Sequence, residues 1–419
     1  MYRLREVEPM GSKIRSSFLN KILFLSLALI LSSCARTKIK ERSAALKIHS
    51  SKISFNDEGE FKNLISSIEK SHKILKRQKN RTMVFGPHKI KATDYAEALE
   101  LLLKTTNMDE FKSHIDSHFS VMAVYGSKSY ADILLTAYYE PVLKGYTYKK
   151  GNYYQPIYKV PSSLIEVDIQ AFASENIGNF TTSRDRIAGR IVNVDGKKRM
   201  VPFFSREEID SKKTLPNRYI MAYVDPVEAF FLHIQGSGTI QLQNKKEIRV
   251  GYAAQNGHRY YPIGKELLDV IPIEDMSLQK IEEHLRNIPK SEKYKILNTN
   301  PSYIFFRKLD NEPETSSGAT VTAMRTLAVD RSLFPLGALT YMEYEAPDFS
   351  ENTEDDTIEF KPTSGFLMAQ DTGGAIKGPA RADLFWGKGE TAKRSAGVMK
   401  NRAKLYFLAP KNFIETDVN

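Results

Sequence analysis

The sequence predicts a mainly β protein with a few scaffold helices, organised as two domains. Short segments rich in β-branched and aromatic residues recur between turn signals such as Asp195-Gly196, which is typical of a barrel or sandwich of short strands. Helical periodicity is confined to a few segments. A polar, Pro-containing stretch from Asp310 to Ser317 separates the last β-rich part from the rest. With 419 residues, the chain can form about two to three cores.

Residues 1–33 have the organisation of a secretion signal. Basic residues from Lys13 to Lys21 precede an apolar run from Ile22 to Leu31, which is too short to span a membrane as a helix. Small residues stand directly before Cys34, the only cysteine, and this pattern resembles a bacterial lipobox. Such signals imply cleavage before Cys34 and its lipidation, and Ala35 after it favours an outer-membrane anchor facing the periplasm. The alternative is a chance cysteine at the end of a signal peptide.

The next part of the chain predicts a tether and the start of the first domain. Residues 34–57 are rich in Lys, Arg and Ser without apolar periodicity, so we expect a tether from the anchor. Helical spacing of apolar residues predicts scaffold helices from Phe61 to Lys76 and from Thr93 to Thr105. An apolar run from Ala131 to Glu140 predicts a buried strand, and we assign residues 58–141 to the first domain.

After this strand the sequence changes to short segments punctuated by Tyr and Pro, and we assign residues 142–308 to a second domain. Tyr- and Pro-punctuated pieces predict short strands, for example from Arg190 to Val194 and from Tyr219 to Val224. One helix is expected from about Ser277 to Ile288, because its apolar residues share one face.

Residues 309–419, after the polar boundary, form a further β-rich part of the chain. Two β-rich runs lie between Thr322 and Met342, and the last strand is expected from Leu405 to Leu408. The acidic stretch from Ala346 to Ser364 predicts a solvent-exposed excursion between strands. The chain has no internal repeat.

Composition and motif content limit the kinds of partner and cofactor that we expect. The formal charge is +11, which suits an anionic polymer or membrane surface but is weak evidence for either. The sequence has no nucleic-acid-binding signature, so we expect no nucleic acid partner. One cysteine excludes internal disulfides and a thiolate metal cluster, and HExxH-like spacing is absent. We therefore expect no metal and no cofactor.

The segment from Ala369 to Gly389 carries the best candidate chemistry. It holds two carboxylates, Asp371 and Asp383, among glycines and a proline that disfavour a helix. Asp383 precedes the apolar residues Leu384 to Trp386, and an acid on an apolar strand is poorly solvated. Poor solvation raises a carboxyl pKa toward the range useful for proton donation. The alternative is that both aspartates cap turns beside glycine.

Five blocks together resemble the membrane-bound lytic murein transglycosylase A family. They are Thr136 to Pro141, Phe230 to Leu242, Gly251 to Gly264, Asn300 to Arg307 and the segment from Ala369 to Gly389. The resemblance runs from about Tyr138 to Pro410 in the family's order. It implies a discontinuous double-psi β-barrel domain, a second β-barrel domain inserted into it, and a glycan groove where they meet.

The resemblance also implies a reaction. Family members cleave the β-1,4 bond between N-acetylmuramic acid and N-acetylglucosamine without water and leave a 1,6-anhydromuramoyl end. Ordinary glycosidases need two carboxylates. Here the C6 hydroxyl of the sugar closes on C1, so one carboxyl group can make both proton transfers. By its position in the motif that group is Asp383, and Asp371 has a supporting role.

Chemistry and resemblance together nominate residues for the groove. The substrate-binding candidates are Tyr138, Tyr139, Glu140, Gln235, Gly236, Ser237, Gln255, Asn256, Lys377 and Trp386. Each candidate also has a structural explanation. Aromatic pairs such as Tyr138 and Tyr139 commonly pack in cores. The pair Asn256-Gly257 alone would predict a turn, and Lys377 could be a solvated surface lysine. We expect His233 and His258 to be structural, because no acid partner stands at a recognisable spacing.

Three other functions stay open. A hydrolase would use Asp371 to activate water, a non-catalytic lipoprotein would only bind murein, and a polymer binder would use the excess positive charge. We expect a monomer bound to peptidoglycan strands and to the membrane. The sequence leaves open partners among cell-wall synthesis or division proteins, endo or exo cleavage, the peptide-stem preference and the start at Met1 or Met10.

Overall fold

A computed structural model describes residues 41–125, 130–169, 186–243, 245–310, 312–349 and 358–414. The predicted signal sequence, Cys34 and the beginning of the predicted tether lie outside these residues, so lipidation stays a prediction. Among the helices in the described ranges, none has the length and apolarity that a membrane crossing requires.

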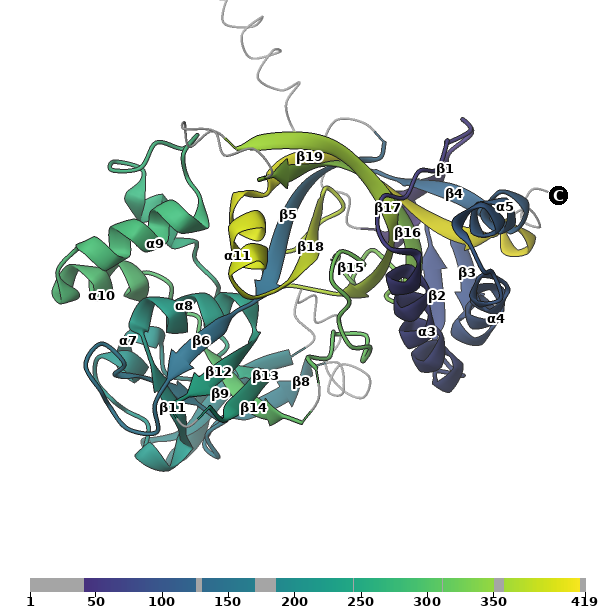
Figure 1. Ribbon diagram of the computed structural model, residues 1–419. Helices are drawn as coiled ribbons and strands as arrows, with labels where there is room; N and C mark the ends of the chain where they lie inside the picture. The colour runs from purple at the N-terminus through teal and green to yellow at the C-terminus, as the bar shows by residue number, and fades with distance from the viewer. Residues whose placement is uncertain are drawn as a thin grey trace, which may run out of the picture. The chain divides into compact units, whose positions relative to one another are not determined.

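The centre of the fold is a closed barrel of six strands (Figure 1). Around the barrel they follow the order β5 (Asp132–Glu140), β19 (Lys400–Pro410), β16 (Ala338–Asp348), β17 (Glu359–Asp371), β15 (Thr326–Ala328) and β18 (Arg381–Lys388). Pairing of β18 with β5 closes the ring, and this pair and the β15–β17 pair are parallel. The expected mainly β fold with a discontinuous barrel is therefore confirmed, since β5 precedes the other five by nearly 200 residues of chain.

The acidic excursion is shorter than expected. β16 and β17 stay paired as far as Asp348 opposite Glu359, so the ladder itself includes much of the acidic stretch.

Helices cover one side of the barrel. They are α3 (Phe61–Arg77), α4 (Ala92–Leu103) and α5 (Met108–His118), with the hairpin β2 (Thr82–Phe85) and β3 (His88–Lys91) beside them. Apolar residues of α3 recur on one face and are buried, as the periodicity predicts. Polar bonds fix the docking: Gln370 in β17 donates to the Ser71 hydroxyl (2.8 Å), and Tyr95 of α4 donates to the Leu408 carbonyl (2.8 Å).

The described part of the predicted tether, residues 41–57, is folded onto the barrel, which corrects that prediction. After α2 (Arg42–Ala45), the strand β1 (Leu46–Ile48) pairs with β4 (Phe119–Val124), which itself pairs with β19. Asp57 forms a two-point ion pair with Arg325, at 2.6 and 2.8 Å. The sequence did not predict this packing because the segment has few apolar residues. One buried apolar side chain, Leu46, and one buried ion-paired side chain, Asp57, contact the barrel instead.

Between β5 and β15 the chain forms the insertion. A four-stranded sheet contains β6 (Val142–Gly145), β12 (Ser237–Leu242), β13 (Glu247–Gln255) and β14 (Ile304–Leu309), and a two-stranded sheet contains β7 (Gln155–Tyr158) and β11 (Ile220–Val224). Single bridges, Tyr146 to Tyr223 and Lys159 to Phe306, join the two sheets at both edges. The insertion is thus a second small barrel, as expected.

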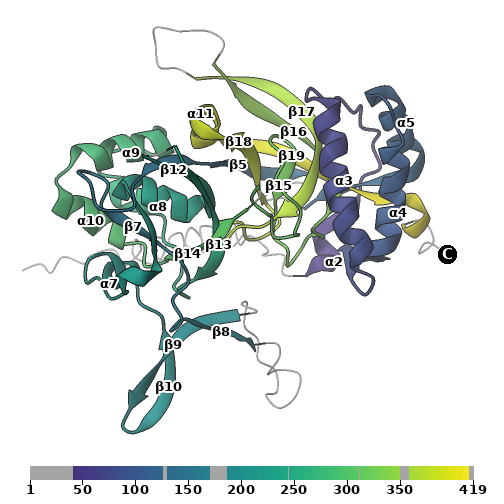
Figure 2. The same ribbon diagram turned by 60° about the horizontal axis from the view of Figure 1, so that its bottom comes forward.

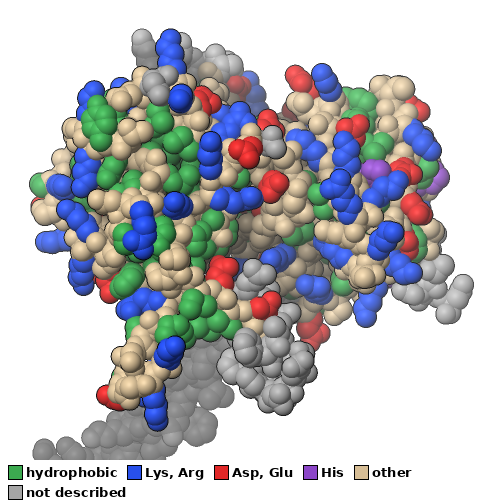
Figure 3. Space-filling view, turned by 90° about the horizontal axis from the view of Figure 1, so that it is seen from below, with side chains coloured by type: hydrophobic (Ala, Val, Ile, Leu, Met, Phe, Trp, Pro, Cys, Tyr) green, Lys and Arg blue, Asp and Glu red, His purple; other side chains and the backbone are tan. Residues whose placement is uncertain are grey.

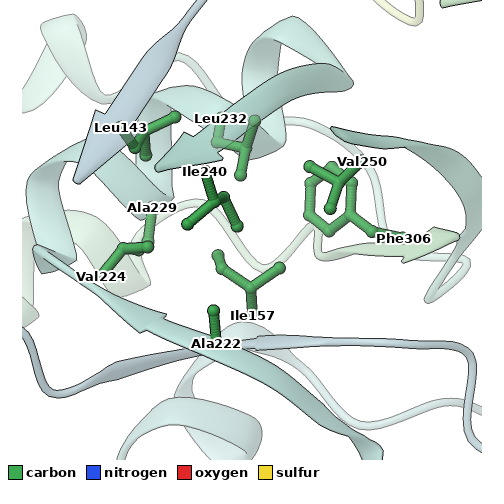
Figure 4. Packing of buried hydrophobic residues seen from close by; sticks show 9 residues of the cluster. All are labelled: Leu143, Ile157, Ala222, Val224, Ala229, Leu232, Ile240, Val250 and Phe306. Atoms are coloured by element: carbon green, nitrogen blue, oxygen red, sulfur yellow. The ribbon is translucent and has the colours of Figure 1, made fainter. Parts of the chain in front are cut away.

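Buried aliphatic side chains from both sheets fill this second barrel. Figure 4 shows Ile157, Ile240 and Val250 turned toward one another around its centre, and all three are fully buried. Each such side chain contributes about 1.5–3 kcal/mol on burial.

Further elements surround the insertion. They are α7 (Arg206–Asp210), α8 (Pro226–Gln235), α9 (Leu278–Asn287), α10 (Lys290–Asn298) and the 3-10 turns η1 (Asn217–Tyr219) and η2 (Ile263–Leu267). Helix α8 begins because Asp225 accepts bonds from the first-turn amides and Pro226 follows it. It ends at Gly236, whose φ of 81° is the left-handed conformation that glycine tolerates.

A three-stranded sheet of β8 (Ile165–Asp168), β9 (Arg186–Val194) and β10 (Lys197–Pro202) extends away from the insertion (Figure 2). After β18, helix α11 (Gly389–Val398) leads into β19, and the 3-10 turn η3 (Lys411–Phe413) follows β19.

The basic excess is dispersed. On the face that Figure 3 shows, Lys and Arg side chains are scattered, with acidic side chains among them. A dispersed charge gives long-range attraction to anions but does not define a binding site.

The Arg325–Asp57 pair generates the first testable prediction. Only 3% of the Arg325 side chain and none of the Asp57 side chain is exposed, so removing one partner leaves a buried charge unpaired. We expect Arg325→Met to lower the free energy of unfolding by about 3–5 kcal/mol in urea denaturation. The matched control is Arg307→Met, whose ion pair with Glu314 is 54% and 53% exposed. That variant should lose less than about 1 kcal/mol, and equal losses for both would contradict the prediction.

Candidate active site

The barrel brings the two predicted aspartates to either side of one short strand. In the three-residue strand β15, Ala328 is paired with Asp371 of β17 on one side and with Asp383 of β18 on the other. Two inter-strand steps separate the backbones of the two aspartates by about 10 Å. Both side chains are half-buried. Aspartates twelve positions apart in the sequence thus face one site.

Asp383 lies on the partly exposed face that β18 shares with β5. The parallel register puts it opposite Thr136, whose hydroxyl donates to Asp383 Oδ1 at 2.8 Å. The pKa of Asp383 is raised to about 6, mainly by loss of solvation and to a smaller extent by the negative charge of Asp371. The Thr136 hydrogen bond and the positive charge of Arg381 oppose this shift. A carboxyl group with this pKa is partly protonated near neutral pH.

Asp371 has a different environment. Its Oδ1 accepts bonds from the Ser316 amide (3.0 Å), the Ser316 hydroxyl (2.9 Å) and the Thr372 amide (2.9 Å). Its Oδ2 accepts the Tyr138 hydroxyl at 3.0 Å. Three of these donors share Oδ1, which is therefore saturated, whereas Oδ2 has one donor and keeps one lone pair.

Tyr138 connects the two sides of the site. Burial and the charge of Asp371 raise the pKa of Tyr138 well above the usual value, so the hydroxyl stays protonated. It donates a hydrogen bond to Asp371. Its ring lies against Phe385, with the ring centres 5.2 Å apart. Phe385 thereby adds an apolar wall two residues beyond Asp383.

Some of the predicted groove residues keep a surface open to solvent. Gln235, Gly236 and Ser237 are half-buried where α8 ends and β12 begins, and the Gln235 side-chain oxygen accepts the Tyr139 amide at 3.0 Å. Lys377 is exposed in the loop between β17 and β18.

Other predicted groove side chains are buried and make contacts within the fold. Glu140 is 6% exposed and accepts the Thr239 hydroxyl at 2.8 Å, and Tyr139 is 3% exposed. Asn256 is fully buried and donates to the carbonyls of Phe204 and Pro301.

Gln255 and Trp386 also make internal contacts. The Gln255 amide donates to the His258 carbonyl (3.0 Å) and the Ser302 hydroxyl (2.9 Å). Trp386 packs against Tyr139 and α11, because it is an odd number of positions from Asp383 and points to the opposite face of β18.

Both histidines are structural in their contacts. His233 is buried with Nδ1 3.0 Å from the Arg206 guanidinium, and burial lowers its pKa well below the usual value. His258 Nε2 lies 2.7 Å from the Phe203 carbonyl. In the described part of the chain no three His, Cys, Asp or Glu side chains form a group that could hold a metal ion.

The sequence interpretation missed Thr136, Ser316 and Phe385 as site residues. Thr136 contacts Asp383 across 247 positions of sequence, and only the strand register reveals this pair. For Phe385, the alternation of β18 was a usable signal, since residues two apart share a face.

Comparisons with known proteins match both parts of the chain. The family model of the MltA specific insert domain matches residues 134–307, and that of the 3D domain matches residues 325–409. The membrane-bound lytic murein transglycosylase A of Escherichia coli K12 is 28% identical over 289 residues, 68% of this chain and 67% of that protein.

Solved structures agree with these matches. The membrane-bound lytic murein transglycosylase from Agrobacterium tumefaciens has a TM-score of 0.68 and 27% identity, over 86% of this chain and 99% of that chain. A monoclinic form of MltA from Neisseria gonorrhoeae has a TM-score of 0.63 and 30% identity, over 83% of this chain and 88% of that chain.

The raised pKa of Asp383 predicts a pH-dependent effect on stability. The folded-state pKa of about 6 lies above the ordinary 3.8, so folding binds the proton and ionisation of Asp383 opposes folding. Asp383→Asn should therefore be more stable than the wild type above pH 6, by roughly 1–3 kcal/mol, and this difference should vanish below about pH 4. Urea denaturation between pH 4 and 8 measures it.

Asp371→Asn is the matched variant for this experiment. Its amide would turn a donor toward groups that already donate, so we expect a loss of roughly 1–3 kcal/mol near neutral pH. A pH-independent effect of Asp383→Asn would contradict the assigned environment of Asp383.

Proposed function

The chain belongs to the membrane-bound lytic murein transglycosylase A family, and we propose that Asp383 is the single acid and base of its reaction. The enzyme is a peptidoglycan lytic transglycosylase. The observation that carries the residue assignment is the contrast between the two carboxyl groups. Asp383 has a pKa raised to about 6 and one recorded donor, Thr136, whereas Asp371 already accepts four hydrogen bonds.

In the proposed mechanism, protonated Asp383 first donates its proton to the oxygen of the β-1,4 bond. The bond between that oxygen and C1 of the muramoyl residue breaks, and the oxygen leaves as the 4-hydroxyl of N-acetylglucosamine. The C6 hydroxyl of the muramoyl residue then bonds to C1, and its proton returns to Asp383. Asp383 ends in the state in which it began, and no water is consumed.

We propose that Asp371 acts as a fixed negative charge. Positive charge develops on the sugar ring as the bond to C1 breaks. A carboxylate held by four donors cannot rotate, so it stabilises this charge without reorganisation. It also raises the pKa of Asp383, which favours the protonated acid.

The hydrolase alternative would require Asp371 to accept a proton from water. The donors from Ser316 and Thr372 saturate Oδ1, and the Tyr138 hydroxyl takes one of the two lone pairs of Oδ2. These hydrogen bonds stabilise the ionised carboxylate and make it a weaker base toward water. This arrangement favours transglycosylation over hydrolysis.

We propose that Tyr138, Gln235, Gly236 and Ser237 contribute to the glycan groove, with Lys377 at its edge. All five are partly or fully exposed, and Gln235 belongs to the insertion whereas Tyr138 belongs to the barrel. This fits our proposed division into domains at residues 58–141, 142–308 and 309–419.

The membrane-bound relatives support association of this chain with a membrane. We propose that lipidated Cys34 provides the anchor, at the periplasmic side of the outer membrane. We also propose a monomeric enzyme, and the chemistry calls for no cofactor.

The reaction predicts the products released from murein sacculi. Wild-type protein should release 1,6-anhydromuropeptides, and Asp383→Ala should lower their release by at least about a thousandfold, because the acid is removed. Mass spectrometry of the soluble products measures both. Tyr252→Ser is the control, since this side chain is 51% exposed on β13, and it should cleave normally. Reducing-end products from the wild type would establish the hydrolase instead.

The pKa of Asp383 predicts the pH dependence of cleavage. Protonated Asp383 is the active form, so kcat/KM should be constant below about pH 6 and fall about tenfold per unit above it. Thr136→Val removes the hydrogen bond that favours the ionised form, so the fall should begin at a higher pH. Initial rates of anhydro-product formation from pH 4.5 to 9 measure this shift. A fall at the same pH in both proteins would contradict the role of Thr136.

A further inference from the structure

Arg381 lies two residues before the proposed acid on the same face of β18. The strand pairs in parallel with β5, so that Arg381 is opposite Leu134 and Asp383 is opposite Thr136. Residues two apart in a strand point to the same side, about 7 Å apart. Leu134, Thr136, Arg381 and Asp383 are all half-buried, whereas the alternate residue Ala382 is fully buried in the barrel. The guanidinium therefore belongs to the open face of the site.

No acidic side chain of the described residues pairs with Arg381. Its Nε is shielded from solvent and has no hydrogen-bond acceptor among them, and they provide no ion pair or aromatic ring for its guanidinium. A shielded donor without an acceptor costs free energy, about 1–3 kcal/mol. Asp383, two positions away, is near enough for the charge of Arg381 to lower its pKa, but neither a hydrogen bond nor an ion pair joins these two described side chains.

The other cations of this face are already engaged. β19 pairs with β5 so that Arg402 is opposite Leu134 and Lys400 is opposite Thr136, which places cations on the two strands that flank β5. Arg402 is paired with Asp132, and Lys400 donates to the Ile273 carbonyl at 3.1 Å. Of these three cations, Arg381 is the one for which the described residues provide no hydrogen-bond acceptor.

We propose that Arg381 binds a carboxylate of the murein strand and so selects muramoyl-containing glycans over neutral ones. This inference deepens the proposed function and depends on it. Murein offers carboxylates in two places: the lactyl group of muramic acid, free where the peptide stem has been removed, and the stem itself. A planar guanidinium donates two parallel bonds to a carboxylate, which gives orientation as well as affinity.

The insertion also faces this position. Tyr260 is 38% exposed, and the positive charge of Arg381 opposes the burial effect that raises its pKa, so the two side chains are close enough to interact. A carboxylate between them would meet charged donors from β18 and a phenol from the insertion. Lys377, the cation that the sequence nominated for this task, is exposed in solvent and lacks this preorganisation.

Binding to an inactive protein tests the assignment. In an Asp383→Asn background, which neither cleaves glycan nor has an acid whose pKa Arg381 could change, affinity is measured by calorimetry. The ligands are stem-free murein oligomers, stem-bearing oligomers and neutral chitohexaose. We expect Arg381→Met to weaken binding of the carboxylate-bearing oligomers about tenfold or more and to change chitohexaose binding less than twofold. Arg381→Lys should restore part of the loss, because it keeps the charge without the planar fork.

The ligands distinguish the sources of the carboxylate. Loss confined to stem-bearing oligomers would assign a carboxylate of the peptide stem, and loss confined to stem-free oligomers would assign the lactyl carboxylate. Loss with both would show that Arg381 accepts a carboxylate from either source. The control variant is Lys404→Met, which removes the same charge from an exposed β19 ion pair and should bind all three ligands normally. Chitohexaose binding also reports that each variant is folded.

Two results would overturn the assignment. Equal weakening for chitohexaose and murein oligomers would make Arg381 a structural residue, and unchanged binding of all three ligands would show that Arg381 takes no part in recognition. Failure of the Asp383→Asn parent to bind any of the three ligands would overturn the proposed function itself, and the assignment with it.

Discussion

The pairing of β5 with β18 and β19 is the constraint on which the rest of the structure depends. β5 comes before the insertion and its two partners come after it, so closing the barrel brings together the segments that flank the insertion. Thr136 and Tyr138 are on β5, and without this pairing neither would reach an aspartate. The same pairing fixes where the insertion leaves the barrel, because β6 begins two residues after Glu140. The strand pairings that close the barrel are therefore the same ones that assemble the site.

Within that frame, the environments of the two carboxyl groups set their chemistry apart. Asp371 is at the end of β17, where loop amides and hydroxyls are available to it, and it takes four of them. Asp383 is in the middle of a sheet whose amides are used by neighbouring strands, so a single hydroxyl from Thr136 is its recorded donor. Asp371, at a strand end, is therefore solvated by protein dipoles. Asp383, within a strand, lacks that solvation and has its pKa raised.

Sequence reasoning reached the fold class and the aspartate pair because both depend on local signals. The motif around Asp371 and Asp383 is contiguous, and the periodicity of α3 is strong. Helix α8 was not predicted, because it is apolar on nearly all sides and lacks a polar stripe. The burial of Glu140 and Asn256 could not be predicted, because polarity alone cannot distinguish a residue that contacts ligand from one that satisfies buried groups. Long-range register, which joins Thr136 to Asp383, has no counterpart in a single sequence.

The acid and the insertion are mechanically connected through α11. β18 carries Asp383 and leads directly into α11, where Lys393 forms an ion pair with Glu282 of α9 at 2.7 Å. On the same helix, the backbone carbonyl of Lys393 accepts a bond from Gln279 at 3.1 Å. Helix α9 of the insertion is thus attached to the element that follows the acid by six residues. The ion pair and the hydrogen bond fix the insertion to the end of β18, so the two parts of the chain together position the strand that carries Asp383.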